Sequence, residues 1–73
     1  MKETIIEIFK TDIETNESAA VIVNKLFDLF PRSRINFDLQ DCDKILRVEG
    51  RDFSVDQVIE TINRLGHKCE ILE

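Results

Sequence analysis

The sequence predicts one α+β domain of element order β-α-β-β-α-β, with a four-stranded antiparallel sheet and both helices on one face of it. Four short segments carry β-branched or alternating apolar residues, and two longer segments carry apolar residues at helical spacing. Polar or glycine-containing connections separate them. Because 73 residues suffice for one hydrophobic core and no more, residues 1–73 are expected to form a single domain.

The first strand and first helix are predicted from β-branched composition and helical spacing. Residues 4–10 are rich in β-branched side chains and have polar neighbours, which is typical of a strand. Residues 17–30 fit a helix that begins at a cap, Thr15 or Asn16, and is stopped by Pro31. The apolar side chains of its expected buried face are Ala19, Ile22, Val23, Leu26, Leu29 and Phe30.

A hairpin is predicted next. Residues 34–40 alternate between apolar and polar, and residues 44–49 form another strand signal. The short acidic turn at 41–43 between them favours direct antiparallel pairing. Leu46 and Val48 are expected to face the core.

A second helix and a last strand complete the pattern. Ser54 is followed three residues later by Gln57, a capping-box arrangement that starts a helix. The helix is expected to run to Leu65, with Gly66 as its C-terminal cap. Residues 67–72 form the last strand signal.

This element order is accommodated most economically by the split-βαβ, ferredoxin-like topology. Right-handed crossovers place both helices on one face of the sheet. The first and third strands are then central, and the second and fourth lie at the edges. A mixed three-stranded sheet is the competing arrangement.

The charge balance argues against two classes of partner. Fifteen acidic residues against ten basic residues give a formal net charge of -5. An acidic surface repels nucleic-acid phosphates and anionic lipid headgroups, so neither nucleic acid nor a membrane is an expected partner. No apolar stretch approaches the roughly 20 residues that span a bilayer, and the N-terminal residues do not resemble a signal peptide, which favours the cytoplasm.

No enzymatic activity is expected from this sequence. The single histidine, His67, has no placed nucleophile beside it, so a catalytic triad cannot be assembled. Gly50 and Gly66 are the only glycines, too few for a glycine-rich phosphate-binding loop. No cofactor is implied by these patterns.

Four features occur together in one family of small domains. They are the strand-loop-helix start, the Leu26…Leu29 end of the first helix, the alternating strand at 35–39, and the Arg64-Leu65-Gly66-His67 end of the second helix. With them the chain resembles the heavy-metal-associated domains over essentially its whole length. The resemblance implies the same ferredoxin-like fold.

The resemblance also identifies a degenerate metal loop. Family members bind a soft ion such as Cu(I) through a Met-Thr-Cys-x-x-Cys loop. Here Thr15 and Ser18 stand where the two cysteines would be, give or take one position, and Ile13 matches the buried loop methionine. Hydroxyl groups cannot replace thiolates for Cu(I), so the conventional site is expected to be lost. Thr15 and Ser18 are interpreted as helix-start residues instead.

A displaced metal site is the second hypothesis. The chain order places the first loop, the hairpin turn and the entry to the last strand at one end of the sheet. Cys42, His67 and Cys69, with Asp41 or Asp12, could there hold Zn(II) or another divalent ion. The simpler interpretations are a buried Cys69 and a His67 that caps the second helix.

The function expected from the sequence is that of a non-catalytic interaction domain, binding a protein partner or a second copy of itself. Ile5, Phe9, Ile45 and Leu72 are expected on the open sheet face as a dimer patch, beside the charged residues Glu7, Asp38, Arg47 and Glu49. Alternatives are the displaced metal site and a small-molecule sensor, which needs a pocket between helices and sheet.

Overall fold

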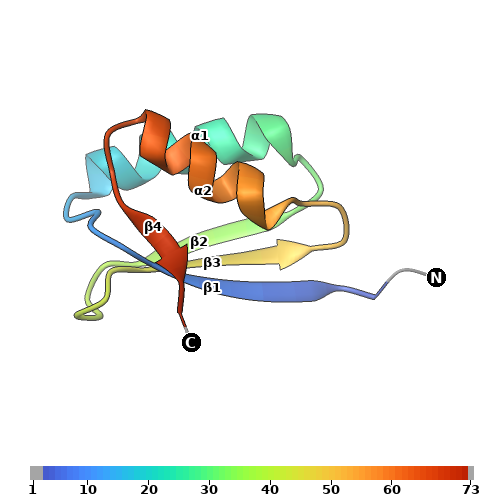
Figure 1. Ribbon diagram of the computed structural model, residues 1–73, viewed down its shortest axis with the longest axis horizontal. Coiled ribbons are helices and arrows are strands. Elements are labelled where there is room, and N and C mark those ends of the chain that lie inside the picture. Colours follow the sequence, from blue (N-terminus) through green and yellow to red (C-terminus); the bar gives the residue numbers. More distant parts are fainter. Residues whose placement is uncertain (1–2, 73) are drawn as a thin grey trace.

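The computed structural model describes residues 3–72 and has the expected element order. The elements are β1 (Ile5–Thr11), α1 (Asn16–Leu29), β2 (Arg34–Asp38), β3 (Ile45–Gly50), α2 (Val55–Arg64) and β4 (Cys69–Ile71). The four strands form one antiparallel sheet in the order β2-β3-β1-β4, and Figure 1 shows both helices on the same face of it. The predicted ferredoxin-like topology is confirmed, and the three-stranded alternative is wrong.

The predicted helix boundaries are confirmed by the caps. The Thr15 hydroxyl accepts a hydrogen bond from the Ser18 N–H at 3.1 Å, and the Ser54 hydroxyl accepts one from the Gln57 N–H at 3.3 Å. Both bonds satisfy N–H groups that the first helical turn leaves without a partner. At the other end of α2, Gly66 has a φ of 91°, which lies in the left-handed region that favours glycine.

The core lies between the sheet and the two helices. Its buried apolar residues are Phe9, Ile13, Ala19, Ile22, Leu26, Phe30, Leu46, Val48, Val58, Ile62 and Cys69. The prediction that Leu29 belongs to the buried face of α1 is wrong, because half of its side chain is exposed. Leu29 instead borders a shallow groove between the two helices, opposite Leu65.

The predicted orientation of β1 is wrong by one residue. Phe9 pairs with Leu46, faces the helices and is completely buried, and Ile5 and Glu7 share its side of the strand. Ile6 and Ile8 therefore face the open side. The local pattern cannot decide between these orientations, because apolar residues lie on both sides of the strand. The large Phe9 side chain gains most from burial, whereas Glu7 stays partly exposed where β1 extends beyond its short ladder with β4.

Candidate functional site

The three connections predicted to share one end of the sheet do meet there, as Figure 1 shows. The Thr11 N–H donates to the Asp43 carbonyl at 3.0 Å, and the Thr11 hydroxyl donates to the Lys44 carbonyl at 2.6 Å. These bonds fasten the loop after β1 to the hairpin between β2 and β3. We call this group of connections, residues 11–15, 39–44 and 65–68, the loop end.

Asp12 fastens the same loop to the entry of β4. Its Oδ1 accepts a hydrogen bond from the Lys68 N–H at 2.9 Å and lies 3.2 Å from His67 Nδ1. The Lys68 hydrogen bond and the nearby His67 lower the pKa of the Asp12 carboxyl group below its ordinary value of 3.8, against a smaller opposing effect of desolvation. The imidazole of His67 thus faces Asp12. The backbone N–H of His67 donates a hydrogen bond to the Ile62 carbonyl and so caps the C-terminal end of α2.

We expect Asp12→Ala to lower the free energy of unfolding by about 1 kcal/mol at pH 7, since the exposed pair is screened by solvent. Because the pKa of Asp12 is lowered in the fold, its contribution is present above pH 3.8 and is lost as the pH falls through the folded pKa. The difference in the free energy of unfolding between Asp12→Ala and the unmodified chain should therefore become smaller in acid. Urea denaturation at several pH values measures it.

The matched control is Glu14→Ala, which removes an exposed carboxylate from the same loop. An equal loss of stability in both variants would contradict the anchoring role of Asp12.

The loop that the resemblance identifies as a degenerate metal loop has a structural role in this fold. Ile13 is completely buried, Thr15 caps α1, and the backbone of Ser18 donates to that cap. Each of the three residues therefore has a role in folding. The predicted helix-start role of Thr15 and Ser18 is confirmed.

The two cysteines lie in different environments. Cys42 is exposed in the hairpin turn, whereas Cys69 is buried and faces the helices. Burial raises the pKa of the Cys69 thiol to about 12, with a smaller contribution from the negative charge of Glu70. A metal-binding thiol must lose its proton, so this environment opposes metal binding by Cys69.

Within residues 3–72, three potential ligand atoms come together only in the hairpin turn. Asp41, Cys42 and Asp43 each place a ligand atom within 4.8 Å of the others, whereas Cys42, His67 and Cys69 do not form such a group. One Asp41 oxygen already accepts a hydrogen bond from the Asp43 N–H at 2.8 Å. Hydrogen bonding between an aspartate side chain and the backbone of the turn therefore explains its acidic composition.

The open face of the sheet presents an apolar strip. Ile6 and Ile8 project from β1, and Ile45 projects from the neighbouring β3. Leu72 lies opposite Ile8, to whose carbonyl its N–H donates at 2.9 Å. Half of Ile6 is exposed. Of the predicted patch, Ile45 and Leu72 lie on this face, and Ile6 and Ile8 take the places expected for Ile5 and Phe9.

Charged side chains surround this strip in balanced numbers. By strand register, three basic and three acidic residues share the open face, namely Lys10, Arg34, Arg47, Asp38, Glu49 and Glu70. Lys10 Nζ lies 3.4 Å from Glu70 Oε1, and Arg47 Nη2 lies 3.2 Å from Glu49 Oε1. Counted over residues 3–72, the strand side chains on this face carry no net formal charge, although the whole chain carries -5. Glu7, predicted to lie here, is on the helix side.

Comparison with known proteins adds no assignment, because no protein-family model and no curated protein matches the chain. Within the described residues, no helix has the length and apolar character needed to cross a membrane. The resemblance to heavy-metal-associated domains therefore agrees with the fold and stays a prediction at the level of family.

Proposed function

We propose that this chain is a non-catalytic interaction domain that pairs weakly with a second copy of itself through the open face of its sheet. The observation that carries the proposal is the apolar strip of Ile6, Ile8, Ile45 and Leu72 on a face with no net charge. Ile6 and Leu72 are exposed and Ile8 and Ile45 are partly exposed, and apolar side chains gain free energy when a partner covers their exposed surface. The loss of the soft-metal ligands at Thr15 and Ser18 is compatible with a heavy-metal-associated-like domain kept for such contacts.

Charge supports a second copy as the partner. Two molecules that each carry -5 repel one another on average, and this repulsion is weakest where the facing surfaces are neutral. The pairs Lys10–Glu70 and Arg47–Glu49 neutralise most of the charge beside the strip. A two-fold axis through this face would place apolar strip on apolar strip.

The size of the face limits the strength of pairing. Four strands about 4.8 Å apart and a seven-residue β1 give a projected area of about 450 Å², whereas stable interfaces bury about 800 Å² per partner. We therefore expect a transient dimer with a dissociation constant between about 10 μM and 1 mM.

Sedimentation equilibrium from about 10 μM to 1 mM tests the proposal. We expect reversible dimer formation that Ile6→Lys abolishes, because a charge would be buried within the contact. Ile6 is paired with Glu49, so the new lysine gains an acidic neighbour across the strands and the fold is retained.

The control is Val21→Lys, which places the same charge at an exposed apolar residue of α1. A strict monomer at about 1 mM, or equal loss of the dimer in both variants, would overturn the proposal.

A further inference from the structure

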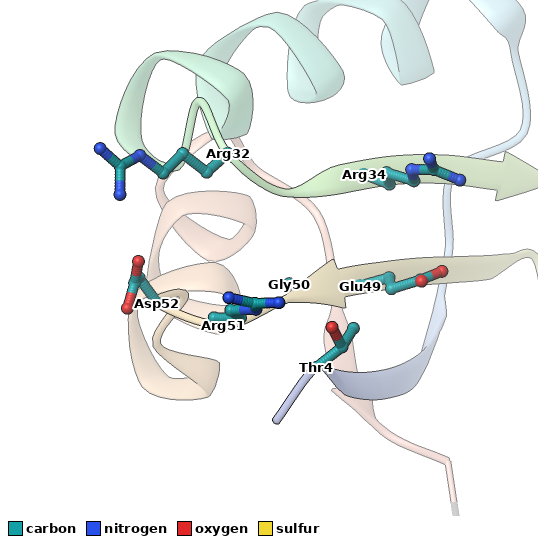
Figure 2. A pocket seen from close by; sticks show the side chains of 7 residues that line it. All are labelled: Thr4, Arg32, Arg34, Glu49, Gly50, Arg51 and Asp52. Atoms are coloured by element: carbon teal, nitrogen blue, oxygen red, sulfur yellow. The ribbon is translucent and has the colours of Figure 1, made fainter. Parts of the chain in front are cut away.

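A second surface, at the end of the sheet opposite the loop end, is lined by three arginines. A hollow of about 440 Å³ is bordered by Thr4, Arg32, Arg34, Glu49, Gly50, Arg51 and Asp52. Figure 2 shows Arg32 and Arg34 on the side of β2 and Arg51 beside Gly50 at the end of β3. The volume lies within the range of small-molecule sites in proteins. We call it the arginine hollow.

A close backbone contact holds the three arginines around this hollow. Ser33 is buried between Arg32 and Arg34 in sequence, and a Cβ atom at Gly50 would lie only 2.5 Å from the Ser33 hydroxyl oxygen. The Cβ atom would also lie 3.1 Å from the Cβ and 3.2 Å from the Cα atom of Ser33, so glycine fits this approach of β3 to the start of β2 without displacing Ser33. Arg51 follows Gly50 directly, so the contact brings it to the two arginines that flank Ser33.

The arginines of the hollow differ from the other two in the chain. Arg47 pairs with Glu49, and Arg64 pairs with Glu60 one helical turn away. Between residues 3 and 72, Arg32, Arg34 and Arg51 have no ion pair. Three guanidinium groups at one hollow repel each other, and their repulsion is relieved when an anion binds among them.

The acidic residues of the hollow do not cancel this charge. Glu49 lies opposite Arg34 in the register of β2 and β3 and also forms an ion pair with Arg47, so it offsets only part of the charge of the three arginines. Asp52 is engaged by an interaction of its own. The hollow therefore has positive charge in excess within an acidic protein.

We propose that the arginine hollow binds a small multivalent anion carrying phosphate or carboxylate groups. Guanidinium groups donate paired hydrogen bonds to both kinds of oxygen, which a lysine cluster does not do in the same geometry. A nucleic acid is a poorer ligand because the remainder of this acidic surface repels an extended phosphate backbone. The hollow shares Arg34 and Glu49 with the open face of the sheet, whereas Arg32 and Arg51 lie beyond the ends of its strands.

Titration of the full chain with pyrophosphate and with citrate, followed by amide NMR shifts at low ionic strength, tests the proposal. We expect saturable shifts centred on Ser33, Gly50 and Arg51, with a dissociation constant below about 1 mM for at least one anion. The tighter of the two anions identifies phosphate or carboxylate as the preferred group. Because all three arginines are exposed, binding should weaken as salt is added.

Arg51→Gln and Arg34→Gln are each expected to weaken binding about ten-fold or more while leaving the fold intact. The matched control is Arg64→Gln, which removes an arginine from α2 outside the hollow and should leave the affinity unchanged. The proposal would be overturned if neither anion saturated the shifts by about 10 mM, or if Arg64→Gln weakened binding as much as Arg51→Gln and Arg34→Gln do.

Discussion

Phe9→Ala is expected to lower the free energy of unfolding by about 3–5 kcal/mol. Phe9 lies on a central strand, is completely buried, and has Leu46 on one side and Ile71 on the other. Its truncation leaves a cavity in the core between the sheet and the helices. A chain of 73 residues has a total stability of about 4–11 kcal/mol, so the substitution is expected to remove a large part of it.

Ile8→Ala is the matched control for this prediction. Ile8 is the neighbouring residue in β1 but faces the open side and is only partly buried. We expect Ile8→Ala to lower the free energy of unfolding by less than about 1.5 kcal/mol, because water can fill the space that the side chain leaves. Urea denaturation followed by circular dichroism compares the two variants. The reverse order of stabilities would mean that β1 has the orientation predicted from the sequence.

Cys42 and Cys69 are expected to differ in reaction rate with a thiol reagent by about a thousand-fold or more. Cys42 is exposed and needs no opening of the structure. Cys69 is buried with a pKa of about 12, so near neutral pH it is protonated and covered, and it reacts only when the domain unfolds. Labelling of Cys42→Ser isolates the rate of Cys69.

The same burial predicts a loss of stability in alkali. The pKa of Cys69 is raised in the fold, so the contribution of this thiol to the free energy of unfolding is fully present below its ordinary pKa of 9.0 and is lost as the pH rises toward about 12.

In the labelling experiment, urea should equalise the reaction rates of Cys42 and Cys69. Equal rates in the native protein would contradict the buried position of Cys69 and would favour its use in a displaced metal site.

Local chemistry allowed most of the fold to be predicted. The caps at Thr15 and Ser54, the stop at Pro31 and the glycine at 66 act within a few residues of their own helix, so neighbouring sequence is sufficient to find them. The exposed Cys42 and the buried Cys69 also follow from local composition and strand alternation.

The errors arose where local patterns are ambiguous. In β1, Ile5, Ile6, Ile8 and Phe9 place apolar side chains on both faces, and the choice depends on which face the helices cover. Leu29 is spaced for the buried face of α1 but lies half exposed in the groove between the helices. The exposure of Leu29 depends on where α1 ends and on how α1 packs against α2. Neither can be read from residues 17–30 alone.

Both proposed surfaces depend on contacts between segments distant in sequence. Chain order predicts that Asp12 and His67 lie at the same end of the sheet, but it predicts neither the neutral charge of the open face nor the three arginines at Gly50. They depend on strand register, which pairs Arg34 with Glu49 and brings Ser33 against Gly50.

The sequence by itself determined the element order, the helix caps and the absence of any Cys-x-x-Cys pair. Only the tertiary structure decided which side of β1 is buried and where the arginines gather. The physical reason is that caps and ligand types are local properties of a few residues. The exposed face of a strand and the surroundings of a charge are instead set by register and by the helices packed against the sheet.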